Sequence, residues 1–454
     1  MKPDAILFVD VDDAVIPNYN YRQPHFIAAR QRGLTCLTAA VQSHRNIERL
    51  HADSDAVYFL EALTVAALQH LLDQLQSYYR VRAVFCHAGH TSAHGQVGCV
   101  VAKVCASLNM PYSTAAAIET CNNKFLMRQA LQKKGIRSVD FALCHSEIQL
   151  QTQAQRIGYP VIAKPPFGAG SAFIKKCHDW PELKEHYHAF ITGYHLAAMA
   201  DFYGVMHQFK TLNGDIQHYQ PGQSLLLEAY IDGTEGSVEC VISNKHIHPI
   251  LLNEKLILTN KSGTILENLL ITPPVSFTAT ENDDIQRYAT DCLSVVGLHN
   301  AIVHLEFRMT EAGPVVIEIN PRLGGLYVNS ALCDIAGIDP YQIYLALLLG
   351  EEDVDAQLTS ARQRAASSTQ HYAMLALYPE NSGFFRGFEN MEEVNKISAI
   401  LEYEVHATNT YVDANIEEHY LFKCWAKVDG KDAAQALHDD MVTTLLPIIT
   451  PDPD

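Results

Sequence analysis

The residues best suited to chemistry lie between His304 and Gly325, in the stretch HLEFRMTEAGPVVIEINPRLGG. Apolar and polar residues alternate on both sides of a Glu-Ala-Gly sequence at 311–313, which predicts two strands joined by a tight turn. Glycine stands at the last position of this three-residue loop, where such a hairpin needs a positive φ. Closing the hairpin there places Glu306 opposite Glu318 on one face.

Two opposed carboxylates predict a bound cation, because like charges directly across a sheet repel each other. His304 faces Asn320 on the same side of the expected hairpin. Oxygen ligands from Glu306, Glu318 and Asn320 suit Mg²⁺, which takes its remaining ligands from water and nucleotide phosphates. Arg322 adds a planar guanidinium for a phosphate or carboxylate. The alternative is a surface hairpin with two solvated glutamates.

Two further segments bring lysines to expected element ends. Lys124 lies at the start of a helix that runs through Leu131, and Lys164 ends a short strand. The glycine loop PPFGAGS at 165–171 follows Lys164, and a strand resumes after it. A Rossmann fingerprint needs a helix there, and a Walker loop needs Lys-Ser or Lys-Thr, so both are excluded. What remains is a strand–loop–strand cover with backbone N–H groups over phosphates.

A third segment could bind a nucleoside. A buried strand from Ser224 ends in an Asp-Gly turn, and Glu235 follows it. The strand edge at Ala229 and Ile231 offers an apolar slot with backbone polar groups for adenine, and a carboxylate further on could accept both ribose hydroxyls. Two exposed glutamates at strand ends, Glu228 and Glu235, are the alternative.

The four signals occur in the order seen in the ATP-grasp superfamily, which the chain resembles most strongly over residues 159–325. The resemblance implies that Mg²⁺, for which Mn²⁺ can substitute, is held by metal ligands on the hairpin, and that a catalytic arginine contacts the transferred phosphate or the acyl phosphate. It also implies ATP-binding residues in the earlier segments. The implied metal ligands are Glu306, Glu318 and Asn320, the catalytic residue is Arg322, and the ATP-binding residues are Lys124, Lys164, Gly168, Gly170, Ser171, Glu228, Ala229, Ile231 and Glu235. Many relatives have Asp before the first lysine, where this chain has Asn123.

The sequence motifs His-x-Glu and EINPRxGG resemble those of the carboxylate–amine ligases of the superfamily, in particular L-amino acid ligases. That resemblance implies activation of an amino acid as an acyl phosphate and its transfer to an amine, with release of ADP and phosphate. Substrate contacts are expected at His87, His304, Gly324 and Gly325. A bicarbonate-using carboxylase of the same superfamily and a nucleotide-binding regulator without turnover remain open.

Two other clusters could carry chemistry. Asp10 and Asp12 follow the first strand and look like the nucleophile motif of haloacid-dehalogenase-type phosphatases, although Val15 is one place late; a polar loop is the alternative. Cysteine and histidine side chains could bind zinc or line a cleft at the start of a helix. This second cluster consists of Cys86, His87, His90 and His94.

The elements that must position these residues predict a mixed α/β and α+β architecture. Strands and helices alternate over residues 1–115, which predicts a Rossmann-like parallel sheet as an N-terminal domain before the ATP-grasp domain. The ATP-grasp domain is expected at 116–350, with a lid at about 136–227 and a catalytic lobe at about 228–350. A small α+β domain is expected at 351–454. Residues 253–274 are polar and are expected to form a long functional loop.

Composition limits the partners. The chain of 454 residues carries 33 basic and 51 acidic residues, a net charge of −18, which argues against nucleic acid. No run approaches the roughly 18 apolar residues of a membrane-spanning helix, so no membrane partner is expected. The 11 cysteines show no C-x-x-C pair, which favours reduced thiols in the cytoplasm. The resemblance implies a homodimer.

Overall fold

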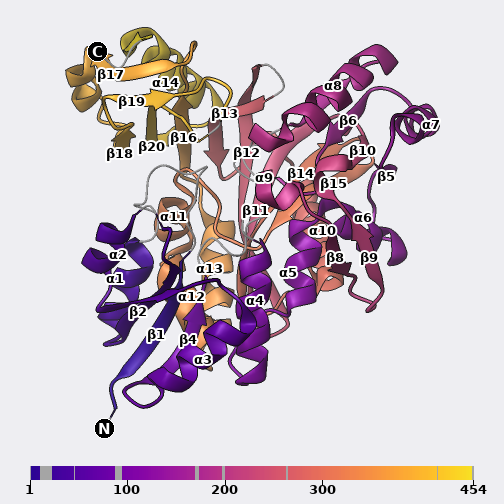
Figure 1. The fold of residues 1–454 in the computed structure, drawn as a ribbon. Helices are drawn as coiled ribbons and strands as arrows, with labels where there is room; N and C mark the ends of the chain where they lie inside the picture. The colour runs from indigo at the N-terminus through magenta and orange to yellow at the C-terminus, as the bar shows by residue number, and fades with distance from the viewer. Residues whose placement is uncertain are drawn as a thin grey trace.

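The computed structural model describes residues 2–10, 23–44, 46–86, 95–168, 173–196, 200–261, 264–416 and 418–451. Three lobes surround a large central sheet (Figure 1). The N-terminal lobe lies at the lower left of that view, the lid at the right, and the C-terminal lobe at the upper left.

The N-terminal lobe is a four-stranded parallel sheet, as predicted, with the order β3-β2-β1-β4. Alternation of short apolar strands with helices explains this topology, because parallel strands need crossover connections. Its strands are β1 (Asp4–Val9), β2 (Thr35–Val41), β3 (Ala56–Leu60) and β4 (Arg80–Phe85), and its helices are α1 (Gln23–Gln31), α2 (Ile47–Asp53), α3 (Val65–Leu75) and α4 (Gly95–Ser107).

Helix α5 (Ala115–Asn122) leads into α6 (Lys124–Lys133). The expected helix through Leu131 is present as α6, and Asn123 separates it from α5. The Asn123 side chain accepts hydrogen bonds from the backbone N–H groups of Phe125 and Leu126, which caps α6. This cap fixes Lys124 as the first residue of the helix.

The lid is an antiparallel sheet with the order β5-β10-β6-β7. The glycine loop connects β6 to β7, so the predicted strand–loop–strand arrangement is present. The strands are β5 (Phe141–Cys144), β6 (Val161–Lys164), β7 (Lys175–Cys177) and β10 (Leu225–Ala229), with α7 (Glu147–Ile157) and α8 (Trp180–Gly193) packed beside them. An extension between α8 and β10 contains η4 (Tyr194–Leu196), α9 (Ala200–Tyr203), the hairpin β8 (His207–Lys210) and β9 (Ile216–Tyr219), and η5 (Pro221–Gln223).

The central sheet has eight strands in the order β15-β14-β11-β12-β13-β16-β20-β18. Helix α10 (Ala279–Val296) is capped by Thr278, which forms a capping box with Glu281, and Gly297 ends it at φ 71°. The sheet strands are β11 (Thr234–Ser243), β12 (His246–Lys261), β13 (Thr264–Thr272), β14 (Ala301–Thr310), β15 (Gly313–Asn320), β16 (His371–Leu377), β18 (Ile400–Val405) and β20 (Phe422–Val428).

The prediction of a long loop over residues 253–274 is wrong. Most of this segment forms the second half of β12 and the whole of β13, which pair antiparallel. The register shifts between Lys255 and Leu258 break the apolar–polar alternation that identifies a strand. In addition, Asn253, Lys255 and Glu267 contact the charged face of the sheet, so the segment is polar although it is a strand pair.

The last strands of the chain continue the central sheet instead of forming a separate one. Strand β16 pairs with β13, and β20 then pairs with both β16 and β18. The sheet therefore crosses the expected boundary between residues 350 and 351, and that boundary stays a prediction. The remaining C-terminal elements are α13 (Val354–Ser367), β17 (Gly383–Glu389), η7 (Met391–Lys396), β19 (Thr410–Val412), α14 (Lys431–Thr444) and β21 (Leu446–Thr450), with a small sheet in the order β19-β17-β21.

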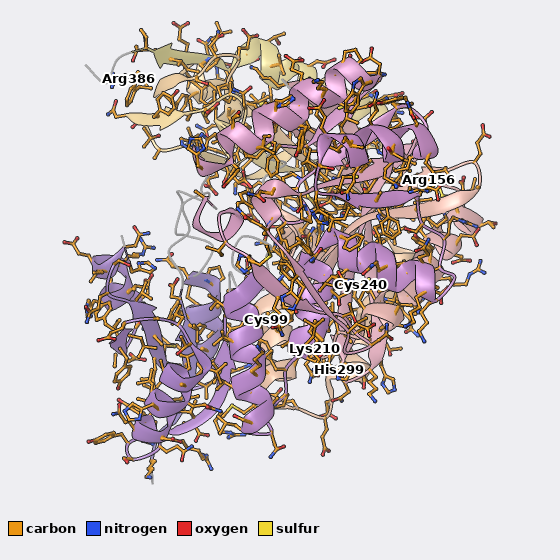
Figure 2. The ribbon with its side chains drawn as sticks, turned by 45° about the vertical axis from the view of Figure 1, so that its right-hand side comes forward. Cys99, Arg156, Lys210, Cys240, His299 and Arg386 are labelled. Carbon is orange, nitrogen blue, oxygen red and sulfur yellow. The ribbon has the colours of Figure 1, made fainter. Side chains whose placement is uncertain are left out.

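One apolar core joins the N-terminal lobe to the central sheet. It is closed by α11 (Val328–Ala331), η6 (Leu332–Ala336) and α12 (Pro340–Leu349). Figure 2 shows Cys240 of β11 inside the molecule, whereas Arg386 lies in the C-terminal lobe and Arg156 on the lid helix α7. No single helix of the described residues is long and apolar enough to cross a membrane. One pair of helices bent by 89°, Val328–Ala336 with Pro340–Leu349, is long and apolar enough when the two are taken together, by length and composition alone.

Trp425 tests whether the last strands stabilise the central sheet. It is fully buried, stacks on Tyr372 at 4.7 Å, and donates a hydrogen bond of 2.8 Å to Asp334. Trp425→Ala is expected to lower the free energy of unfolding by about 3–5 kcal/mol in a urea titration, since it leaves a large cavity. Tyr411→Ala removes a half-exposed ring from the same lobe and is expected to change it by about 0.5 kcal/mol or less.

Candidate active site

The hairpin of β14 and β15 places Glu306 opposite Glu318 and His304 opposite Asn320, as predicted. The predicted three-residue loop is wrong, because Thr310 already pairs with Gly313. The extra residue lies instead in a bulge at Ile317, between the Glu306–Glu318 pair and the next pair along the strands. The register is therefore as predicted at the carboxylates and differs by one residue at the turn.

Arg128 explains why the bulge is stable. Its guanidinium donates hydrogen bonds to the carbonyl oxygens of Val316 (2.8 Å) and Ile317 (3.2 Å). The same side chain, which is fully buried, binds both carboxylate oxygens of Glu228 in the lid sheet. One arginine of α6 thus fixes the strand with the expected metal ligands against the strand with the expected adenine edge.

The opposed carboxylates have positive partners from the protein itself. Lys124 Nζ lies 2.8 Å from Glu318 Oε2, and Lys255 Nζ lies 3.0 Å from Glu306 Oε2. The Asn320 amide donates to Glu318 Oε1 at 2.8 Å and to Glu306 Oε1 at 3.5 Å. Burial alone would raise the pKa of both carboxyls, but these partners lower it, so both are ionised.

This set of donors fits a hard divalent cation. Two ionised carboxylates and an amide are oxygen ligands of the kind that Mg²⁺ prefers. They lie on one face of a two-stranded ribbon, and each is half-buried. Glu306, Glu318 and Asn320 are therefore the residues that would hold Mg²⁺.

His304 extends the charged face toward the Gly-Gly loop. Its Nδ1 lies 2.6 Å from Glu239 Oε1, and its Nε2 lies 3.5 Å from Glu306 Oε1. Burial would lower the pKa of His304, but the two carboxylates raise it to about 10. Gly324 packs against this pair: a Cβ there would lie 2.7 Å from His304 Nδ1 and 3.1 Å from Glu239 Oε1, whereas Gly325 faces open space.

Glu228 and Lys164, both expected to bind ATP, form a buried pair. Lys164 Nζ lies 2.7 Å from Glu228 Oε2, and Arg128 Nε lies 2.7 Å from Glu228 Oε1. Burial would raise the pKa of Glu228, but the two cations lower it to about 2, while burial lowers the pKa of Lys164. Glu228 of the lid strand β10 therefore binds Arg128 of α6 and Lys164 of β6 together in this structure.

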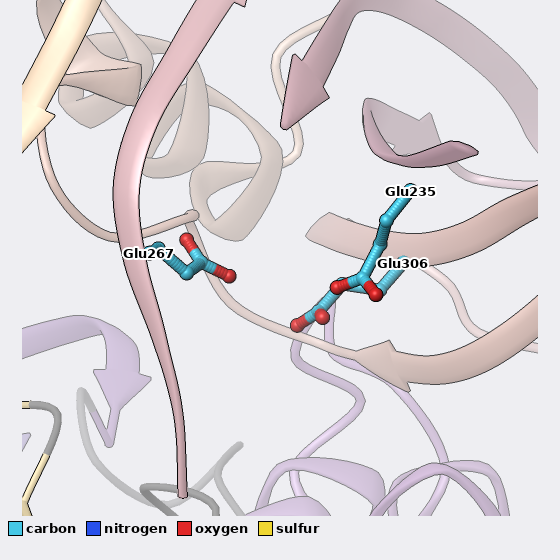
Figure 3. Close-up of side chains that lie close together, drawn as sticks. All are labelled: Glu235, Glu267 and Glu306. Carbon is cyan, nitrogen blue, oxygen red and sulfur yellow. The ribbon is translucent and has the colours of Figure 1, made fainter. Parts of the chain in front are cut away.

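Glu235, the expected ribose ligand, lies at the other end of the charged face. Arg308 donates to Glu235 Oε2 from Nε (2.9 Å) and from a terminal nitrogen (2.8 Å), and Lys255 lies 2.9 Å from Oε1. Glu267 of β13 pairs with the same lysine, and Figure 3 shows its carboxylate facing those of Glu235 and Glu306. Burial would lower the pKa of Lys255, but the three carboxylates raise it well above its usual value.

The expected adenine edge follows β10. The backbone N–H of Ala229 donates to Asp140 O at 2.9 Å, and the carbonyl of Ile231 accepts from Arg308 at 2.7 Å. Lys176 Nζ lies 3.5 Å from the centre of the Tyr230 ring between them. Arg308 thus links the Ile231 carbonyl to Glu235, and the binding of adenine at this edge stays a prediction.

The extension before β10 supports the glycine loop. Phe167 at the start of the loop stacks on Phe209 of β8 at 5.1 Å, and Tyr203 donates a hydrogen bond to the Phe167 carbonyl at 3.0 Å. Tyr219 of β9 accepts a hydrogen bond from Asn123, next to Lys124. The extra length of the lid therefore holds two expected phosphate-binding segments together.

The remaining predicted residues are placed as follows. Gly168 is half-buried at the edge of the described glycine loop, and Arg322 is half-buried and donates to Leu323 O at 2.9 Å. Gly170, Ser171, Asp12, His87, His90 and His94 lie outside the described residues. Asp10 is buried 3.5 Å from His44, and Cys86 is buried at the end of β4.

Sequence reasoning missed Arg128, Lys255, Glu267, Arg308 and Glu239. Arg128 lies one helical turn after Lys124 on α6, so its i, i+4 spacing could have placed it on the same face. Lys255 and Glu267 lie in the segment interpreted as a loop. Arg308 and Glu239 become visible only through the pairing of β11 with β14, which is not encoded locally.

Residues 157–330 match the family model of the ATP-grasp domain. This chain therefore contains an ATP-grasp domain, and its architecture is the ATP-grasp fold. Over 99% of the chain the fold is similar to that of a crystal structure of the L-amino acid ligase from Bacillus licheniformis, of which it covers 100%, with a TM-score of 0.73 and 18% identity.

Curated relatives match over part of their length. The chain is 28% identical to the uncharacterized protein y4rH of Sinorhizobium fredii over 64% of this chain and 54% of that protein. It is 24% identical to carnosine synthase 1 of Homo sapiens over 53% of this chain and 28% of that protein. The match thus spans about half of the first relative and less of the second.

The pKa of His304 gives a test of the charged face. Since the pKa rises from 6.5 to about 10 on folding, the stabilisation from His304 is fully present below pH 6.5 and is lost as the pH rises through 10. His304→Gln is expected to lower the free energy of unfolding by about 3 kcal/mol below pH 6.5, because it leaves buried Glu239 without its cation.

This difference between His304→Gln and the natural protein should shrink between pH 6.5 and 10 in chemical denaturation at a series of pH values. His70→Gln, at an exposed histidine of α3, is the matched control and should show no such window. A difference that stays constant over the range would contradict a charged His304.

Proposed function

We propose that this protein is an ATP- and Mg²⁺-dependent ligase. It activates the carboxylate of an amino acid as an acyl phosphate and joins it to an amine. The observation that carries the proposal is the pairing of Glu306 with Glu318 beside Asn320 on one face of β14 and β15. The likeness to an L-amino acid ligase and to carnosine synthase 1 supports the choice of substrates.

Residues of the chain supply most of what phosphoryl transfer requires, which is position and charge. Glu235 and the edge after β10 bind the nucleoside, while Lys124, Lys164 and Arg322 contact the phosphates. Glu306, Glu318 and Asn320 would hold Mg²⁺, which would offset the negative charge of the phosphates. The glycine loop and the lid sheet close over the phosphates and keep water away.

Two bond exchanges complete the reaction. A carboxylate oxygen of the first substrate attacks the γ-phosphorus, the bond from that phosphorus to the β–γ bridging oxygen breaks, and ADP leaves. The amine nitrogen of the second substrate then attacks the acyl carbon, an amide bond forms, and phosphate departs while the amine gives up a proton to solvent. His304, charged and 3.5 Å from Glu306, lies where it can hold a substrate oxygen next to the metal ligands.

Glu318→Gln tests the assignment of the metal ligands. The change removes one negative charge with little change in shape, and it is expected to lower the rate of Mg²⁺-dependent ADP formation roughly 100-fold or more, because metal stabilisation of the transition state is worth several kcal/mol. Glu311→Gln makes the same change at the exposed turn of the same hairpin and should leave the rate unaltered. Normal turnover by the Glu318 variant would refute the site.

Phosphate release with Mg²⁺-ATP should be measured against amino acids singly and in pairs, with detection of products by mass. The proposal expects release that depends on a pair and a product equal to their sum less one water. Release that depends on bicarbonate would favour a carboxylase, and ATP binding without turnover a regulator. Activity lost in Asp10→Asn but kept in Glu318→Gln would favour a phosphatase.

A further inference from the structure

Lys255 occupies the place of a metal ion in a cluster of three carboxylates. Oxygen atoms of Glu235, Glu267 and Glu306 all lie within 4.8 Å of one another, a spacing that could hold a metal ion. The Lys255 ammonium lies 2.9 Å from Glu235 Oε1 and 3.0 Å from Glu306 Oε2, and it also pairs with Glu267. Figure 3 shows the three acidic side chains converging from β11, β13 and β14.

The lysine is built into this position. Only 1% of its side chain is exposed, and it extends from β12, which lies between β11 with Glu235 and β13 with Glu267; β14 with Glu306 lies beyond β11. An ammonium is a compact charge with three donors, which matches one hydrogen bond to each carboxylate. With Arg308, which pairs with Glu235, two positive groups then face the three carboxylates, and the centre of the cluster is filled.

Glu306 is shared between this cluster and the hairpin site. One of its oxygens faces Lys255, and the other faces His304 and Asn320. A free divalent cation that approaches Glu306 meets two positive groups and little uncompensated charge. The same cation delivered with a triphosphate brings its own negative charges, so its entry adds little net charge to the site.

We propose that Lys255 is a positioning residue that fills the cation site between Glu235, Glu267 and Glu306, and so prevents a divalent metal from binding before the nucleotide. The inference rests on the proposed function in that it takes Glu306 as a metal ligand. It adds that metal and nucleotide enter the site together. It also adds that the Lys255 ammonium links Glu235, the expected ribose ligand, to Glu306, the expected metal ligand.

The test is a titration of the nucleotide-free protein with Mn²⁺, followed by the loss of the free Mn²⁺ paramagnetic resonance signal. The natural protein is expected to bind Mn²⁺ weakly until ADP is added. Lys255→Met leaves the three carboxylates without their cation and is expected to gain one Mn²⁺ per chain, bound about tenfold or more tightly without nucleotide. Lys255→Arg keeps the charge and should behave as the natural protein does.

Two further variants test whether the gained Mn²⁺ affinity comes from the cluster of three carboxylates. Lys261→Met removes an ammonium from the same strand, but that lysine contacts backbone carbonyls of residues 379 and 380, so no gain is expected. Lys255→Met combined with Glu267→Gln should lose the gained affinity, because the cluster then offers two carboxylates. If Lys255→Met does not fold by circular dichroism, Lys255→Gln, which can still donate to the carboxylates, carries the same expectation.

Two results would overturn the proposal: unchanged Mn²⁺ affinity in a folded, uncharged Lys255 variant, or one tightly bound Mn²⁺ per chain in the nucleotide-free natural protein. No turnover is needed for either measurement. If ADP fails to promote Mn²⁺ binding in the natural protein while the Lys255 variant gains a site, the metal assignment in the proposed function fails and the role of Lys255 stands.

Discussion

The structure depends on the compensation of buried carboxylates along one face of the central sheet. Ionised groups are costly to remove from water unless opposite charges contact them. Here lysine, arginine and histidine side chains from three different elements reach the acidic row. Its acidic residues are Glu235, Glu239, Glu306 and Glu318, and their partners are Arg308, His304, Lys255 and Lys124. Glu228 of the lid sheet is compensated in the same way by Lys164.

Compensation of this kind also organises the lobes relative to one another. Arg128 belongs to α6, yet it binds the lid strand β10 through Glu228 and the hairpin of β14 and β15 through two carbonyl oxygens. Lys124, one turn earlier on the same helix, binds Glu318. Helix α6 thus connects the lid sheet to this hairpin, and a shift of this helix would alter both.

The sequence predicted those features that depend on local pattern. Strict alternation and a glycine turn were enough to place Glu306 opposite Glu318, and repeated short apolar segments were enough for the parallel N-terminal sheet. Local pattern failed where distant residues decide the geometry. The bulge at Ile317 is stabilised by a helix almost two hundred residues earlier in the chain, with Arg128 and Val316 separated by 188 positions.

Polarity was the second source of error. The second half of β12 and the whole of β13 were interpreted as a loop because the segment is polar, yet Lys255 and Glu267 within it belong to the charged face of the sheet. A strand that carries a charged face lacks the signature by which strands are identified. The break between α5 and α6 also depends on distant residues, since the Asn123 side chain caps α6 and the Lys124 N–H donates to the Pro166 carbonyl.

The continuity of the central sheet bears on how the protein can be divided. Truncation after Gly350 would strip β16 from β13 and leave a row of backbone amides and carbonyls along β13 without partners. Such a bare edge invites pairing with other chains. A shortened form ending at the expected domain border would therefore tend to self-associate, and an excised catalytic lobe is a poor substitute for the whole polypeptide.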